Sequence, residues 1–168
     1  NTSSLSVASL AEATGRPGRF VGLHFMNPAP RMPLVEVVGH DKLDEGVKGD
    51  VLAFVGEIGK EAVLVKDAPG FVVNRLLMPL IGEAARALED GVASAADIDK
   101  AMKLGCGHPM GPLSLADSIG LDTVKAELEE MSGKLGSRYD PAGLLVRLVA
   151  EGKLGRKSGE GFFRYRRS

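Results

Sequence analysis

The sequence is poor in cysteine and aromatic residues and has no long apolar run. It contains no tryptophan and one cysteine, Cys106, so no internal disulfide can form. No apolar segment approaches the roughly 20 residues that a membrane-spanning helix needs. Acidic and basic side chains number 22 and 21, and the net charge of -1 gives no field that would attract nucleic acid or an anionic membrane. We therefore expect no nucleic-acid and no membrane partner, and a reducing, cytoplasmic setting.

Several catalytic motifs are also absent. Three scattered histidines and one cysteine offer no ligand pair at a known metal spacing, so we expect no metal site. No Gly-x-Ser-x-Gly motif surrounds Ser3 or Ser4, which argues against a serine hydrolase, although Ser3 can still serve as a hydrogen-bonding hydroxyl. No Gly-x-Gly-x-x-Gly motif follows a predicted strand, so the sequence has no dinucleotide-binding fingerprint of its own.

The first 67 residues have the pattern of a small α/β unit. Short apolar segments rich in β-branched residues predict three strands, and the prolines between the first two exclude a helix there. Apolar residues at helical spacing predict a helix between the second and third strands, and a short helix capped by Ser6 precedes all of them. The predicted strands are residues 20–25, 34–38 and 62–65, and the predicted helices are residues 7–14 and 44–59.

After residue 67 the pattern changes to helices, and we place a domain boundary between residues 67 and 68. In the first of these helices, several apolar residues are expected to lie on or near one face, which would pack into a core: Leu76, Leu77, Leu80, Ala84 and Leu88. The predicted helices are residues 71–90, 94–104, 113–131 with a break near Gly120, and 142–151. The expected fold class is therefore α/β for residues 1–67 followed by all-α for residues 68–168.

His24 and Glu36 are the strongest candidates for chemistry. His24 lies at the carboxyl end of the first predicted strand, where open α/β sheets place their ligands. Glu36 lies within the next strand among apolar residues, where an unpaired carboxylate would be costly to bury. If the two strands are neighbours, the two side chains can pair as an acid/base dyad in which the carboxylate orients the imidazole. Spacing alone leaves open the alternative of a structural histidine and a structural carboxylate.

The remaining reactive residue types are interpreted as structural. His40 follows Gly39 at a strand end and is expected to be a solvated turn residue. His108 precedes Pro109 in a turn rich in glycine and proline, and the same interpretation holds. Cys106 has no helix start or basic neighbour to activate it, so we expect an ordinary, semi-buried thiol.

Seven motifs, in this order and with these gaps, resemble those of 3-hydroxyacyl-CoA dehydrogenases. They cover essentially the whole chain, and each is weak when taken alone. The seven segments are residues 1–5 (Asn-Thr-Ser-Ser-Leu), 22–28 (Gly-Leu-His-Phe-Met-Asn-Pro), 34–38, 67–75, 107–112, 120–122 and 155–163. Residues 108–113 look closest to bacterial 3-hydroxybutyryl-CoA dehydrogenases, which implies a short acyl-CoA substrate.

The resemblance implies a role for each site residue. His24 would take the proton of the substrate 3-hydroxyl, and Glu36 would hold and charge-balance its ring. Ser3 would hydrogen-bond near the reacting oxygen and the cofactor, and Asn74 would present its amide to the substrate, with a helix cap as its alternative role. The cofactor would be NAD, with NADP possible. It would be contacted further by two residues, Asn27 and Lys157.

The resemblance also implies an architecture that the chain contains only in part. Residues 1–67 would be the C-terminal remnant of a Rossmann-type NAD-binding domain, and residues 68–168 the helical domain through which a homodimer forms. The glycine-rich loop and the residues that meet the adenosine ribose and CoA would precede Asn1. Two alternatives stay open: a non-catalytic helical dimerisation or interaction module, and a part of a multifunctional β-oxidation protein.

Overall fold

The computed structural model describes residues 2 and 5–165. The chain divides into two compact units, Asn1–Val73 and Asn74–Ser168. The first unit is α/β and the second is helical, as the sequence predicts.

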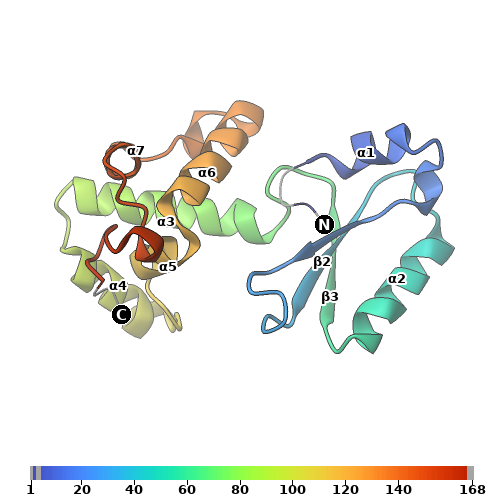
Figure 1. Cartoon of the computed structure of the whole chain (residues 1–168), viewed down its shortest axis with the longest axis horizontal. Coiled ribbons are helices and arrows are strands. Elements are labelled where there is room, and N and C mark those ends of the chain that lie inside the picture. Colours follow the sequence, from blue (N-terminus) through green and yellow to red (C-terminus); the bar gives the residue numbers. More distant parts are fainter. Residues whose placement is uncertain (1, 3–4, 166–168) are drawn as a thin grey trace. The chain divides into compact units, whose positions relative to one another are not determined.

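The first unit is built on a three-stranded sheet with the order β1-β2-β3 (Figure 1). Strand β2 pairs antiparallel with β1 and parallel with β3. The strands are β1 (Gly22–Phe25), β2 (Leu34–Gly39) and β3 (Glu61–Lys66), and the helices are α1 (Val7–Ala13), η1 (Pro17–Arg19) and α2 (Glu45–Glu57). The predicted order of helix and then β-β-α-β is confirmed, although β1 begins at Gly22 and not at residue 20.

The central strand β2 is buried on both faces. Its side chains alternate between the two faces, and a different helix packs against each face. Val35 and Val37 pack with Val55 of α2. Val38 points to the opposite face, where it packs with Val7 of α1 and with Phe71. Alternation places the side chain of Glu36 on this second face, and Figure 1 shows the sheet lying between the two helices. A carboxylate is therefore brought into an apolar layer.

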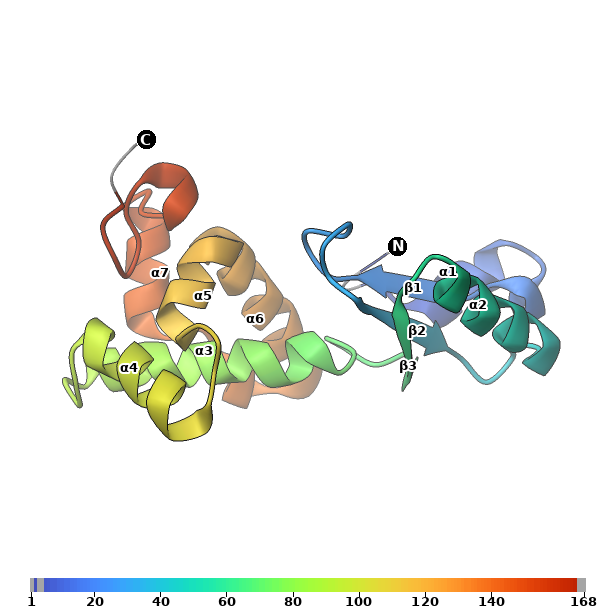
Figure 2. The ribbon, with the colours of Figure 1, turned by 90° about the horizontal axis from the view of Figure 1, so that it is seen from below.

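The second unit is a cluster of helices around one apolar core. The long helix α3 has α5, α6 and α7 beside it (Figure 2). Its elements are α3 (Val73–Glu89), α4 (Ala95–Cys106), α5 (Pro112–Ile119), α6 (Leu121–Leu135), η2 (Ser137–Tyr139), α7 (Gly143–Ala150) and η3 (Arg156–Ser158). The core takes Ile81 from α3, Leu113 from α5, Leu128 from α6 and Leu145 from α7, each at most 1% exposed.

Three details of the helical unit differ from the sequence prediction. Helix α3 begins at Val73 and not at residue 71, because Phe71 has a φ of 46°, which no helix contains. Leu76 is 70% exposed, so its placement on the buried face was wrong; Met78 and Ile81 point inward instead. Cys106 is exposed at the last residue of α4, so the expectation of a semi-buried thiol was also wrong.

Candidate active site

His24 and Glu36 face each other across the antiparallel pair of β1 and β2. The strand register puts the two residues directly opposite. Their side chains lie on the same face of the sheet, and His24 Nδ1 is 2.6 Å from Glu36 Oε2. The exposed fraction is 7% for His24 and 1% for Glu36. The contact predicted from the two strands is therefore present, and it is buried.

The second oxygen of Glu36 is held by the backbone. Oε1 accepts hydrogen bonds from the amides of Val72 and Val73, each at 2.9 Å, where α3 begins. Burial by itself would raise the pKa of Glu36, but the hydrogen bonds from His24 and from these two amides, with the attraction of the imidazole, lower the pKa below its ordinary value of 4.5. The carboxylate is thus ionised at neutral pH, and both of its oxygens accept hydrogen bonds.

The ring of Phe71 packs against the imidazole. The two ring centroids are 5.6 Å apart and the planes are tilted by 57°. Phe71 is 4% exposed, and its positive φ turns the chain just before the amides that bind Glu36. One short segment, residues 71–73, therefore fixes both members of the pair: its ring contacts the histidine and its amides bind the carboxylate.

This geometry selects one tautomer of His24. Because Nδ1 faces an ionised carboxylate, Nδ1 carries the ring proton and donates a hydrogen bond to Oε2 of Glu36. Nε2 is then the basic nitrogen of the neutral ring, and within residues 2 and 5–165 it has no hydrogen-bond partner. If Nε2 takes up a proton, the resulting imidazolium is balanced by Glu36. The pair can therefore act as a general base and, in the reverse direction, as a general acid.

The other residues expected at the site are distributed over the chain. Ser3 lies outside the described residues. Asn27 is exposed in the loop just after β1. This loop is held by the Lys60 ammonium, which donates hydrogen bonds to the carbonyls of Ala29 at 2.8 Å and Met32 at 2.9 Å. Asn74 is half-buried in the first turn of α3, and its side chain has no hydrogen-bond partner in the described part of the chain. The alternative role of Asn74 as a helix cap therefore receives no support.

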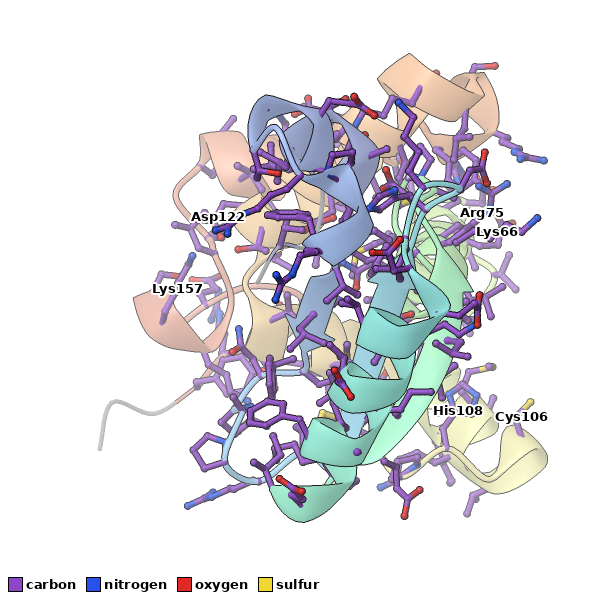
Figure 3. All side chains as sticks on the ribbon, turned by 90° about the vertical axis from the view of Figure 1, so that its right-hand side faces the viewer. Lys66, Arg75, Cys106, His108, Asp122 and Lys157 are labelled. Carbon is purple, nitrogen blue, oxygen red and sulfur yellow. The ribbon has the colours of Figure 1, made fainter. Side chains whose placement is uncertain are left out.

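Lys157 projects from η3 toward the start of α6. Its ammonium is 2.6 Å from Oδ2 of Asp122 and also contacts Oδ1, and Figure 3 shows the two labelled side chains side by side. The hydrogen bond from Lys157 lowers the pKa of the Asp122 carboxyl. The two side chains are 47% and 42% exposed, and such surface ion pairs contribute little stability.

Sequence reasoning missed two buried carboxylates, Asp99 and Asp117. Asp99 accepts from the amides of Leu113 and Ser114, and Asp117 accepts from residues near the C-terminal end of the described chain. A signal for the second was present. Asp117 follows Leu113 by four residues and therefore lies on the buried face of α5, where a carboxylate requires a partner.

The two other histidines are both half-buried. His40 is half-buried, and its Nε2 is 2.9 Å from the carbonyl of Phe20, so the expectation of a solvated residue was wrong. His108, after α4, is also half-buried, so the same expectation was wrong there. Residues 2 and 5–165 contain no group of three metal-ligand side chains, and none of the helices formed by them is long and apolar enough to cross a membrane.

Comparison with known families covers both units. Residues 1–68 match the 3-hydroxyacyl-CoA dehydrogenase NAD binding domain, and residues 70–165 match the 3-hydroxyacyl-CoA dehydrogenase C-terminal domain. The chain belongs to the 3-hydroxyacyl-CoA dehydrogenase family. The resemblance predicted from the seven motifs is therefore confirmed.

Individual members of the family match almost all of the chain. It is 51% identical over 166 residues to a probable 3-hydroxybutyryl-CoA dehydrogenase of Bacillus subtilis, which covers 98% of this chain and 58% of the relative. It is 48% identical over 169 residues to human mitochondrial hydroxyacyl-coenzyme A dehydrogenase, covering 99% of this chain and 54% of the relative.

The crystal structure of (S)-3-hydroxybutyryl-CoA dehydrogenase from Ralstonia eutropha is similar in fold. It matches with a TM-score of 0.96 at 47% identity, covering 99% of this chain and 59% of that one. The chain thus spans 54% to 59% of the length of these three relatives.

Proposed function

We propose that the chain carries the catalytic dyad of an oxidoreductase that interconverts a 3-hydroxyacyl-CoA and the corresponding 3-ketoacyl-CoA. The single observation that carries the proposal is the buried pair of His24 and Glu36, whose Nδ1 and Oε2 are 2.6 Å apart. Matches to both domains of the family support this activity over a non-catalytic interaction module. Relatives named for 3-hydroxybutyryl-CoA support a short acyl chain as the substrate.

In this mechanism His24 moves the proton and Glu36 stabilises the charge that results. In the oxidation direction, Nε2 of His24 takes the proton of the 3-hydroxyl, while Nδ1 keeps its own proton and continues to donate a hydrogen bond to Oε2 of Glu36. The imidazolium formed is stabilised by a carboxylate that is already ionised and held by two amides. In the reduction direction the same imidazolium returns the proton to the 3-keto oxygen. The Ser3 hydroxyl and the Asn74 amide would bind the reacting oxygen.

The cofactor is proposed to be NAD, with NADP as the alternative. When bound, its nicotinamide supplies or accepts the hydride at C3 of the substrate. The polar groups on the chain fit such a ligand, because the Asn27 amide and the Lys157 ammonium are both exposed donors suited to hydroxyl and phosphate oxygens. Ser3 is proposed as a third contact. Neither the Asn27 nor the Lys157 side chain needs to break a buried interaction in order to bind.

The proposal extends to organisation and location. The domain boundary is placed between residues 67 and 68, residues 1–67 are proposed as the remnant of a Rossmann-type NAD-binding domain, and the helical domain is proposed to form a homodimer in the cytoplasm. Analytical ultracentrifugation of the chain gives its mass directly. A mass of twice 17.7 kDa is expected, and a monomer at micromolar concentration would contradict the dimer.

The test of function is oxidation of NADH that depends on acetoacetyl-CoA. It compares the chain alone with a fusion in which the glycine-rich nucleotide-binding half of a relative precedes Asn1. We expect turnover by the fusion and little by the chain alone, because binding energy from that half positions the nicotinamide. A fusion that binds both ligands and shows no turnover would contradict the proposal and leave the interaction module in its place.

A further inference from the structure

A buried carboxylate on α5 holds the C-terminal segment of the chain. Asp117 is 1% exposed. Its Oδ1 accepts from the amide of Phe162 and its Oδ2 from the amide of Phe163, each at 2.9 Å. Oδ2 also accepts from the phenol of Tyr165 at 2.9 Å. Three donors separated from Asp117 by 45 to 48 residues thus converge on one side chain.

The segment that it holds, residues 154–165, has a closed and specific shape. The amide of Gly155 donates to the carbonyl of Glu160 at 2.8 Å, and the amide of Tyr165 donates to that of Gly159 at 2.9 Å. The Ser158 hydroxyl oxygen lies 3.1 Å from the carbonyl of Gly155 and 2.8 Å from that of Glu160, and its one hydrogen is shared between these two acceptors. The segment is therefore one loop held together by its own hydrogen bonds. A contact that fixes residues 162–165 also restrains residues 155–158 of the same loop.

Two glycines allow this loop to approach α5 closely. A Cβ atom on Gly161 would lie 2.0 Å from Oδ1 of Asp117, and one on Gly155 would lie 2.3 Å from the Asp117 carbonyl oxygen. Gly155 also has a φ of 91°, which favours glycine. At both glycines the atom nearest to the added Cβ belongs to Asp117.

The outer turn of the same loop carries Lys157. The Lys157 ammonium donates a hydrogen bond to Asp122. It also lies close to Gly120, where an added Cβ atom would be 3.1 Å from Lys157 Nζ. Asp117 and Asp122 flank Gly120, so the loop is bound on its inner side by the buried carboxylate and on its outer side by the exposed one. The inner contact is the stronger of the two because Asp117 is 1% exposed and accepts three hydrogen bonds.

We propose that Asp117 is a positioning residue for the cofactor site: it fixes the C-terminal loop and thereby holds the Lys157 ammonium beside Asp122, where a cofactor oxygen can reach it. This inference rests on the proposed function, in which Lys157 contacts NAD. Asp117 does not touch the ligand itself. Its contribution is preorganisation, because a lysine on a loose loop would lose conformational entropy on binding.

Burial of this charge carries a cost that a purely packing role does not explain. Burial raises the pKa of Asp117, the nearby charge of Asp99 adds to the rise, and the donors Phe162, Phe163 and Tyr165 oppose it. An apolar residue would fill the same space without that cost. The carboxylate instead ties a terminal loop to a single geometry, as a fully satisfied polar network does.

The test compares Asp117→Asn with Asp99→Asn as a matched control. Both residues are buried carboxylates bound by amides, but Asp99 holds the start of α5 and not the loop. Hydrogen exchange of the Phe162 and Phe163 amides is measured in the chain, and the kinetics are measured in the fusion. We expect exchange to accelerate at least about tenfold in Asp117→Asn and to change little in Asp99→Asn. We expect KM for NADH to rise roughly fivefold to tenfold in Asp117→Asn with kcat nearly unchanged.

Tyr165→Phe provides a milder second variant that keeps both amide bonds to Asp117. It should give a smaller change in the same direction, and it keeps the test decisive if Asp117→Asn does not fold. Normal turnover with an unchanged KM for NADH in a variant whose loop exchanges fast would refute the positioning role alone. Absence of turnover in the unsubstituted fusion, with slow loop exchange, would instead refute the proposed function.

Discussion

His24 Nδ1 lies 2.6 Å from Glu36 Oε2 across two antiparallel strands, and the other oxygen of Glu36 binds the amides of Val72 and Val73. The carboxylate thereby links a histidine on β1 to the backbone of Val72 and Val73 within the first unit. Its removal should affect both catalysis and folding, and the two effects can be separated by the choice of substitution.

Glu36→Gln should lower kcat strongly in a protein that still folds. Glutamine keeps the size of the side chain and can still accept hydrogen bonds from the amides, but it cannot balance an imidazolium. We expect kcat of the fusion to fall by roughly 10² to 10⁴ with KM for acetoacetyl-CoA little changed. Steady-state kinetics check this, and a kcat within a few-fold of the unsubstituted value would mean that the charge of Glu36 is not needed.

Stability at acid pH should depend on the same carboxylate. Because the pKa of Glu36 is lowered in the folded chain, its ionisation contributes stability above its ordinary value of 4.5, and that contribution disappears as the pH falls through the lowered pKa. The unsubstituted chain should therefore exceed Glu36→Gln in unfolding free energy at neutral pH, and the difference should shrink below pH 4.5. Urea unfolding at several pH values measures it, and a difference that does not vary with pH would contradict the assignment.

Gly22 should be intolerant of a side chain because α1 packs directly on it. A Cβ atom there would lie 2.6 Å from Val7 Cγ2 and 3.1 Å from Val38 Cβ. We expect Gly22→Ala to destabilise the chain by about 1–3 kcal/mol, as overpacked cores do. Gly49→Ala on the exposed side of α2, where no atom lies within 4 Å, is the matched control and should be neutral or stabilise by up to about 1 kcal/mol. Equal effects in thermal unfolding would show that α1 does not pack as described.

Tyr165 should report the charge of Asp117. Burial, the hydrogen bond to Asp117 and its negative charge raise the pKa of Tyr165 to about 12. Since the chain has two tyrosines and no tryptophan, a Tyr139→Phe background leaves Tyr165 as the only phenol seen in an alkaline absorbance titration. Asp117→Asn should lower this pKa toward 10.0, and Asp99→Asn should leave it high. An unchanged titration in Asp117→Asn would show that the contact does not persist in solution.

The sequence predicted the pair of His24 and Glu36 because both residues interrupt short apolar strands that follow each other closely. A carboxylate flanked by valines needs a partner, and the neighbouring strand supplied one candidate. The helices were predicted from helical periodicity and from local signals, since a capping residue such as Ser6 acts on the turn beside it and can be recognised in the sequence.

What the sequence did not reveal depends on long-range contacts or on backbone geometry. The hydrogen-bond partners of Asp117 lie 45 residues or more further along the sequence, so the residues around Asp117 do not indicate which loop it binds. The positive φ of Phe71 is unusual for a bulky residue and has no local sequence signal, so the start of α3 was placed two residues early. Leu76 fits the helical period as well as its buried neighbours do, and periodicity alone could not tell that it faces outward.

The central claim is that His24 transfers the proton, and chemical rescue tests it most directly. The ring is 7% exposed, so His24→Ala leaves a cavity that free imidazole can enter. In the fusion, His24→Ala should lower kcat by about 10² to 10⁴, His108→Ala should change it little, and added imidazole should restore part of the activity of His24→Ala alone. A His24→Ala fusion that turns over acetoacetyl-CoA and NADH at nearly the unsubstituted rate would contradict the assignment of His24 as the acid/base residue.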